Sequence, residues 1–128
     1  SSSFKITEAL GVIGPGTNEP EAVTSAPTLR WVDDAGENYY TVVVYDAYGE
    51  LVWCRSDAQI NGRTCEGGNI PGFSGSGNPE VVYGGPLEEG MYYQFPVTSW
   101  KTTGGGNANA CALSTTEDLR GVFYVDVN

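Results

Sequence analysis

The chain has 128 residues, the size of one domain, and its 16 acidic against 6 basic residues give a formal net charge of −10. Such a surface repels phosphate groups, so we expect neither nucleic acid nor an anionic membrane as a partner, and the apolar runs are too short for membrane insertion. The sequence contains no histidine, which excludes Ser-His-Asp and Cys-His catalysis and histidine-bearing zinc sites.

The first 13 residues carry an alternating apolar pattern, formed by Phe4, Ile6, Leu10 and Val12. Such a segment is either an ordinary first strand of the chain's own sheet or an added strand that pairs with the open sheet edge of a neighbouring molecule. Residues 1–13 of the single domain 1–128 are therefore interpreted as an extension or an exchanged strand, with these four side chains binding the partner.

Strand signals dominate the rest of the chain, because aromatic and β-branched runs alternate with turn-forming residues. The residues Asp46-Ala47-Tyr48-Gly49 predict a turn that joins two of these runs into a hairpin. The glycine-rich stretches 14–26, 55–79 and 101–116 are expected to be long loops. The predicted strands are Thr28 to Val32, Tyr39 to Tyr45, Leu51 to Trp53, Met91 to Trp100 and Gly121 to Val127.

Alternation along these strands separates a core from an opposite face. The predicted core contains Trp31, Tyr40, Val42, Val44, Tyr93, Phe95 and Val97. The opposite faces carry aromatic residues that are able to stack on sugar rings or to join a protein partner. The candidates for ligand stacking are Tyr39, Tyr45, Tyr92 and Trp100.

The three cysteines, Cys54, Cys65 and Cys111, lack the close spacing of a metal knuckle. The acidic, lysine-poor composition, rich in Gly, Ser and Thr, favours an extracellular or cell-surface location, where one disulfide is expected. The preferred pair is Cys54–Cys65, which are separated by ten residues bent at Asn61-Gly62, and Cys111 is the alternative partner.

The acidic residues show no pattern that indicates catalysis or metal binding. They lie in predicted turns, and no spacing matches a calcium loop. A glycosidase needs two carboxylates across one cleft, for which so small a domain offers little room. We therefore expect no catalytic residue, no metal and no cofactor.

Three segments resemble fibronectin type III and related immunoglobulin-like modules of bacterial surface or secreted proteins. The stretch 26–31 resembles their second strand with its core tryptophan, and 40–44 resembles their third. The segment Leu87 to Tyr93 resembles the corner in which a tyrosine hydroxyl bonds back to the backbone. The resemblance covers about residues 20 to 127 and implies an all-β, two-layer antiparallel sandwich of about seven strands. Pro96 requires a bulge or a locally missing neighbour in the sixth strand.

These observations predict a non-enzymatic, extracellular structural or adhesive module that works through faces and edges. In this interpretation it self-associates or binds other surface proteins, as a subunit of a surface assembly or filament linked through strand edges. The alternative is a carbohydrate-binding module that uses the exposed aromatic residues to bind glycans.

Overall fold

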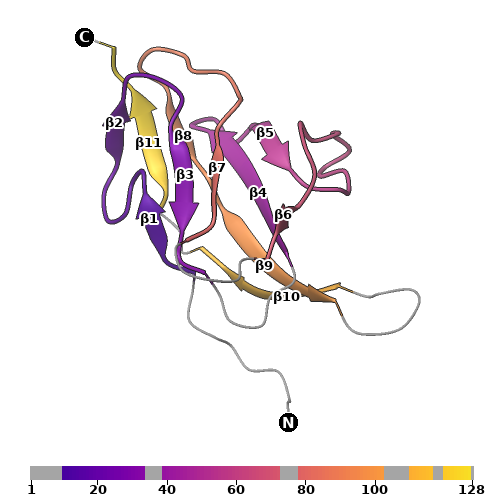
Figure 1. Cartoon of the computed structure of the whole chain (residues 1–128). Helices are drawn as coiled ribbons and strands as arrows, with labels where there is room; N and C mark the ends of the chain where they lie inside the picture. The colour runs from indigo at the N-terminus through magenta and orange to yellow at the C-terminus, as the bar shows by residue number, and fades with distance from the viewer. Residues whose placement is uncertain (1–9, 34–38, 73–77, 103–109, 117–119, 128) are drawn as a thin grey trace.

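Two β-sheets form the part of the chain that the computed structural model describes, residues 10–33, 39–72, 78–102, 110–116 and 120–127 (Figure 1). The smaller, antiparallel sheet has the order β1 (Val12–Gly14), β3 (Thr28–Trp31), β7 (Glu80–Val82). The larger sheet has the order β10 (Ala110–Thr115), β9 (Val97–Thr102), β4 (Tyr39–Asp46), β8 (Tyr92–Gln94), β11 (Val122–Val125), β2 (Glu21–Val23). Two further strands, β5 (Leu51–Arg55) and β6 (Ile70–Pro71), also pair with β4. The predicted all-β class is confirmed.

The described residues form eleven strands, more than the seven or so that we expected. The additional strands, β2, β6, β7 and β10, are short, and all but β7 lie within stretches that the glycine and proline content marked as loops. In addition, β2 runs parallel to β11, so the larger sheet is mixed rather than wholly antiparallel. Short strands of this kind arise from pairing with a neighbour and leave little periodicity in the sequence.

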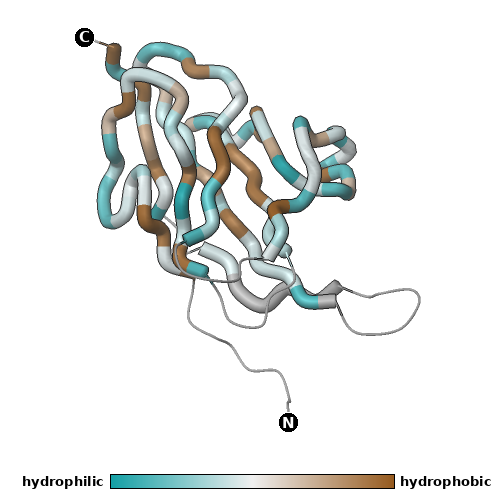
Figure 2. The backbone as a smooth tube through the Cα atoms, in the orientation of Figure 1, coloured by the Kyte–Doolittle hydropathy of each residue, from teal (hydrophilic) through white to brown (hydrophobic). Residues whose placement is uncertain are grey.

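The core lies between the two sheets. Leu29 and Trp31 of β3 and Tyr40, Val42 and Val44 of β4 are fully buried, and the Trp31 and Tyr40 rings meet edge to face with centroids 5.4 Å apart. Figure 2 shows hydrophobic stretches along the strands and hydrophilic residues along many of the connections. All the residues predicted for the core are buried, and each large apolar side chain removed from water contributes roughly 1.5–3 kcal/mol.

A second group of aromatic rings extends the core near β5. Tyr83 contacts the rings of Trp53, Tyr93 and Phe123, with centroid separations from 5.3 to 6.0 Å. Burial, with Tyr93 alongside, raises the pKa of the Tyr83 hydroxyl far above its usual range. The hydroxyl therefore stays protonated and donates a hydrogen bond of 2.7 Å to the Pro86 carbonyl.

Tyr93 also fixes the turn through which the chain enters β8. Its hydroxyl oxygen accepts a hydrogen bond from the backbone N–H of Glu88 at 2.9 Å, and the side chain is 2 % exposed. Between them, Gly90 has a φ of +82°, a conformation that glycine adopts without steric cost. The hydroxyl thus ties a buried ring to a turn on the surface.

Pro96 falls between β8 and β9, which continue one another along β4. The pairs Val42–Val97 and Tyr45–Gln94 have two residues between them on both strands, so the register is not shifted at Pro96. On the other side, the partner changes from β10 to β11 at this point. Of the two expected accommodations, the structure shows the interrupted neighbour, with no bulge against β4.

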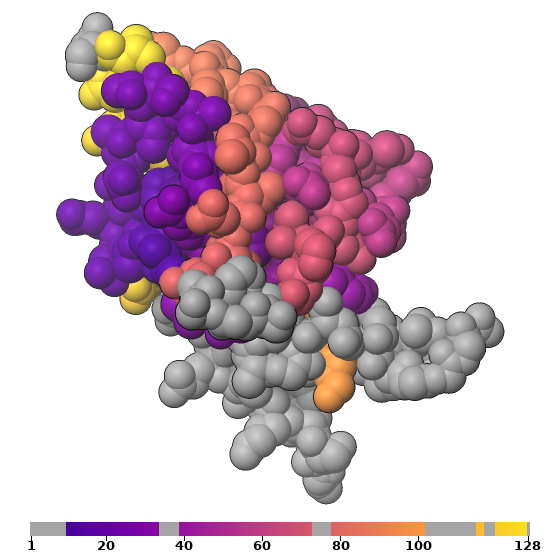
Figure 3. Space-filling model, in the orientation of Figure 1, coloured from indigo at the N-terminus to yellow at the C-terminus, as the bar shows by residue number. Residues whose placement is uncertain are grey.

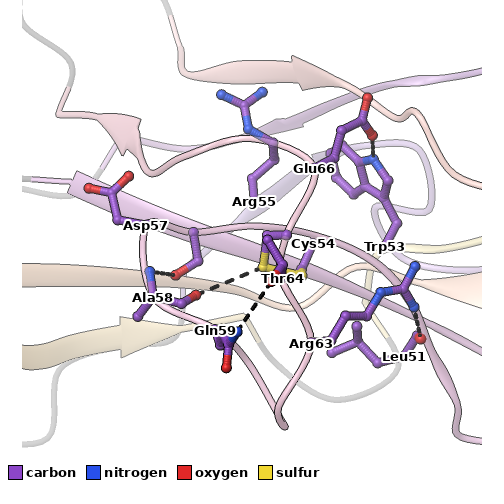
Figure 4. Close-up of a disulfide and its surroundings, with 12 residues drawn as sticks. Leu51, Trp53, Cys54, Arg55, Asp57, Ala58, Gln59, Arg63, Thr64 and Glu66 are labelled. Atoms are coloured by element: carbon purple, nitrogen blue, oxygen red, sulfur yellow. Dashed lines mark hydrogen bonds between the residues drawn. A yellow bond between two sulfur atoms is a disulfide. The ribbon is translucent and has the colours of Figure 1, made fainter.

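The disulfide joins Cys54 of β5 to Cys65, as predicted, with Cα atoms 4.8 Å apart (Figure 4). Cys111, the alternative partner, lies on β10 and takes no part in this bond. The segment between the two cysteines turns at Asn61-Gly62, where φ is +51° and +77°. These angles are those of a two-residue hairpin turn with both central residues in the left-handed region.

The disulfide-linked segment covers the outer edge of β5. The Glu66 N–H donates to the Cys54 carbonyl at 3.1 Å, and the Ser56 N–H donates to the Gly67 carbonyl at 2.9 Å. An uncovered edge is a template for pairing with another chain, so these contacts protect this edge of the larger sheet.

Side chains complete this cover. The Arg63 guanidinium donates to the backbone carbonyls of Leu51 and Val52, and the Trp53 indole N–H donates to the Glu66 carboxylate. Figure 4 shows Arg63 reaching Leu51 and Glu66 beside Trp53, both to the right of the disulfide.

Replacing Tyr93 by phenylalanine should lower the free energy of unfolding by about 1 kcal/mol, because the ring stays while the acceptor for the Glu88 N–H is lost. Urea denaturation followed by tryptophan fluorescence measures the loss. Tyr48→Phe is the matched control, since Tyr48 is 82 % exposed and its change should stay within about 0.5 kcal/mol. Equal stability of the two variants would contradict a stabilising role for this hydrogen bond.

Reduction of the disulfide by a thiol should lower the free energy of unfolding by roughly 2–3 kcal/mol, because the unfolded chain regains the freedom of the closed loop. Cys54→Ala/Cys65→Ala should show a comparable loss and no response to the thiol. Cys111→Ala should respond as the unaltered chain does. If the urea midpoint of Cys111→Ala were the same with and without the thiol, Cys111 would have to be part of the disulfide.

Candidate functional site: an aromatic outer face

Aromatic side chains gather on the side of the larger sheet that faces away from the core, which we call the outer face. Along β4 the buried residues alternate with Tyr39 and Tyr45, which therefore point outward. Trp100 is the register partner of Tyr39 on β9, and Tyr92 on β8 precedes the buried Tyr93. The smaller sheet is toward the viewer in Figure 3, so the outer face is turned away there.

Four of these rings form two stacked pairs. Tyr39 and Trp100 are nearly parallel, with centroids 6.2 Å apart, and the Trp100 indole N–H donates to the Thr41 hydroxyl at 2.9 Å. Tyr92 and Tyr124 stack with centroids 4.8 Å apart and an interplanar angle of 23°. Stacking fixes the ring orientations before any ligand arrives, which lowers the entropic cost of binding.

The two pairs lie at opposite ends of β4. Tyr39 is the first residue of β4 and pairs with Trp100. Asp46, the last residue of β4, pairs with Tyr93, which directly follows Tyr92 on β8. Seven residue steps of about 3.3 Å separate these ends by about 23 Å. The outer face therefore presents two separate aromatic patches, with Tyr45 between them.

Tyr124 was not among the stacking residues that we predicted. Alternation along the last strand already placed it opposite to the buried Phe123. However, only the pairing of β11 with β8, in which Tyr124 is the partner of Tyr92, brings the two rings together. That pairing leaves no pattern in either segment.

A shallow pocket of about 210 Å³ adjoins the Tyr92–Tyr124 pair, and we call it the Tyr92 pocket. Tyr92 is 44 % exposed. The Asp46 carboxylate is held by backbone N–H groups of Tyr48 and Glu50 at 2.9 and 3.0 Å, which both donate to Oδ1. The lining residues are Asp46, Ala47, Tyr92, Tyr93, Gln94 and Val122.

Two of the four residues predicted to bind a partner as an exchanged strand, Leu10 and Val12, lie in the described part of the chain. Leu10 is 6 % and Val12 is 7 % exposed, and both belong to the core of their own chain. β1 pairs with β3, which is the ordinary first strand that we weighed against strand exchange. Phe4 and Ile6 lie outside the described residues.

Three other hollows among the described residues carry charged side chains. One of about 330 Å³ lies between β1, β2 and β3 and includes Glu21 and Arg30, and one of about 280 Å³ lies beside the disulfide and includes Arg63 and Glu66. A third, of about 280 Å³, includes Glu19 and Glu21. Arg63 and Glu66 already bind groups of their own chain, whereas Arg30 pairs with Glu80 at 2.9 Å.

The carboxylates of the described residues do not assemble into a metal centre, since no three of the Cys, Asp and Glu side chains described here are grouped as ligands. Asp33 instead accepts a hydrogen bond from the Tyr40 hydroxyl at 2.6 Å, and Glu89 accepts one from the Val127 N–H. Asp34 and Glu37 fall outside the described part of the chain.

In the described residues there is no helix with the length and hydropathy that a membrane crossing requires. Comparison of the chain with models of protein families, with curated proteins and with solved structures finds no match.

Proposed function

We propose that the protein is a non-enzymatic structural or adhesive module that binds its partner through the outer face of the larger sheet. The observation that carries this proposal is the pair of aromatic stacks, Tyr39–Trp100 and Tyr92–Tyr124, on one face. Large, rigid aromatic side chains provide contact area at low entropic cost and are enriched where proteins bind one another.

The cover on β5 and the burial of Leu10 and Val12 favour a face over these edges as the adhesive surface. The disulfide-linked segment covers the outer edge of β5, and Leu10 and Val12 are used in the core. A strand donated to a neighbouring copy would have to end before Leu10. Assembly through strand edges is thus less well supported than binding through the outer face.

An extracellular location and an immunoglobulin-like or fibronectin type III relationship belong to the same proposal. The Cys54–Cys65 disulfide is typical of proteins from oxidising compartments. The buried Trp31 on β3 and the hydrogen bond between Tyr93 and Glu88 are features that such modules share.

Carbohydrate binding is a second candidate for the same face. The nearly parallel Tyr39 and Trp100 rings, with an interplanar angle of 11°, form the kind of flat platform on which a sugar ring stacks. This candidate differs from protein adhesion in the ligand, not in the surface.

The labelled chain should bind specifically on an array of extracellular proteins that includes the chain itself, or on a glycan array run in parallel. Tyr39→Ala/Trp100→Ala or Tyr92→Ala/Tyr124→Ala should weaken that binding at least tenfold, because each pair removes two large contact groups. Binding on the protein array alone supports adhesion, and binding on the glycan array alone supports the second candidate.

Ile13→Ala/Val82→Ala is the matched control, since both side chains are exposed and lie on strands of the smaller sheet. This variant should bind as the unaltered chain does, with thermal unfolding showing that every variant is folded. The proposal fails if neither array shows binding, or if the control loses binding while both outer-face variants keep it.

A further inference from the structure

We infer that the outer face binds one extended, neutral polysaccharide chain of the cellulose type, a proposal that rests on the outer face being the binding surface and names the ligand of its carbohydrate-binding form. In this arrangement the chain runs along β4 and stacks on both aromatic pairs. The Tyr39–Trp100 pair and the Tyr92–Tyr124 pair are then the two ends of a single site.

Both pairs lie along the same line of strands. β8 and β9 continue one another beside β4, with Tyr92 near one end of this line and Trp100 near the other. Tyr92 precedes the buried Tyr93 and Trp100 follows the buried Ser99, so alternation turns both rings outward. An extended chain of about five pyranose rings covers the distance of about 23 Å between the ends of β4.

The Trp100 indole reaches across the sheet toward β4. Its N–H donates at 2.9 Å to the hydroxyl of Thr41, although the residue directly opposite Trp100 is Tyr39. The Tyr39 ring lies nearly parallel to the indole, at an interplanar angle of 11°. The two rings therefore form one platform over β4 and β9, on which the C–H groups of a sugar ring can stack.

Tyr92 provides the second platform. It is 44 % exposed, and its ring stacks on Tyr124 with centroids 4.8 Å apart. The Tyr92 pocket, with a volume of about 210 Å³, leaves space for a sugar beside this ring. Because the stack already holds the Tyr92 side chain, binding orders little that was mobile before.

The surface between the two platforms is uncharged, which favours a neutral ligand. None of the 16 acidic and 6 basic residues of the chain occupies an outward position on the described parts of β4, β8, β9 and β11. A charged ligand finds no opposite charge there, and the net charge of −10 repels an acidic polysaccharide. Hydroxyl and amide groups can exchange hydrogen bonds with a neutral sugar. The outward residues of these strands between the platforms are Thr41, Val43, Tyr45, Gln94 and Thr98.

The distance between the platforms favours one kind of glycosidic linkage. The β-linked glucose chain of cellulose is an extended ribbon that can remain in contact with both ends of β4. The α-linked chain of amylose coils, so it leaves the line of the strands after the first platform. Two contacts made by one ligand strengthen its binding beyond either contact alone, and the extended chain is therefore favoured.

The test is titration of the full chain with cellohexaose, cellobiose and maltohexaose, in which chemical-shift changes of backbone amides report where each sugar binds. Cellohexaose should shift amides at both platforms, residues 39–41 and 92–94, and should bind roughly tenfold more tightly than the other two. Raising the sodium chloride concentration from 20 to 500 mM should change its dissociation constant by less than about twofold, because no charges meet. An octaproline peptide, a neutral extended chain without sugar hydroxyl groups, should bind more weakly.

Two substitutions show whether the platforms act together. Trp100→Leu and Tyr92→Leu each keep an apolar side chain but lose a flat ring, so each should weaken cellohexaose binding about fivefold or more and bring it close to that of cellobiose. Tyr92→Phe keeps the ring and should bind nearly as the unaltered chain does. Tyr48→Leu, in the turn after β4 and 82 % exposed, is the control and should bind normally.

The inference is overturned if cellohexaose shifts no amides of the outer face, if cellobiose or maltohexaose binds as tightly, or if octaproline binds more tightly at the same residues. It is also overturned if Trp100→Leu and Tyr92→Leu bind cellohexaose as the unaltered chain does. In each case the protein array still reports on the outer face through Tyr39→Ala/Trp100→Ala, so failure of the polysaccharide site and failure of the proposed function are distinguishable.

Discussion

Because successive side chains of a strand point to opposite sides, the eight residues of β4 serve the core and the surface at the same time. Tyr40, Val42 and Val44 are fully buried against the smaller sheet, and the same backbone turns Tyr39 and Tyr45 outward. A shift of register by one residue would exchange the two sets and bury the outer residues in place of the core. The packing of the core thus fixes which residues lie on the outer face, and it holds the strands that carry the aromatic pairs in place.

The β5 edge of the larger sheet is covered, whereas its outer face is exposed. Along β5, a disulfide, a hairpin turn and the Arg63 guanidinium occupy backbone groups that would otherwise pair with another chain. On the outer face, by contrast, Tyr92 remains 44 % exposed although it is a large aromatic residue. The cover on β5 limits pairing of this edge with other chains, whereas the outer face keeps a large aromatic side chain accessible for contact.

Much of the fold was predictable, because it rests on local patterns. The long strand β4, the hairpin to β5, the buried Trp31 and the turn at Asn61-Gly62 all follow from residue types and spacing, and the structure contains each of them. The four short additional strands were not predicted, since segments of two to six residues carry too little periodicity, and all but β7 lie in stretches whose glycine and proline content indicated loops. Whether the alternating segment with Leu10 and Val12 pairs within its own chain or with a neighbouring molecule is not specified by any local pattern.

For the candidate site, the sequence alone determined which side chains of each strand share a side, because alternation is a property of the chain itself. It thereby set Tyr39, Tyr45, Tyr92 and Trp100 apart from the core. Tertiary structure alone decided which of them meet: the pairing of β8 with β11 stacks Tyr124 on Tyr92, and the pairing of β4 with β9 sets Trp100 beside Tyr39. The physical reason is that strand order and register depend on the packing of the whole core, in which residues more than 40 positions apart in the chain become neighbours.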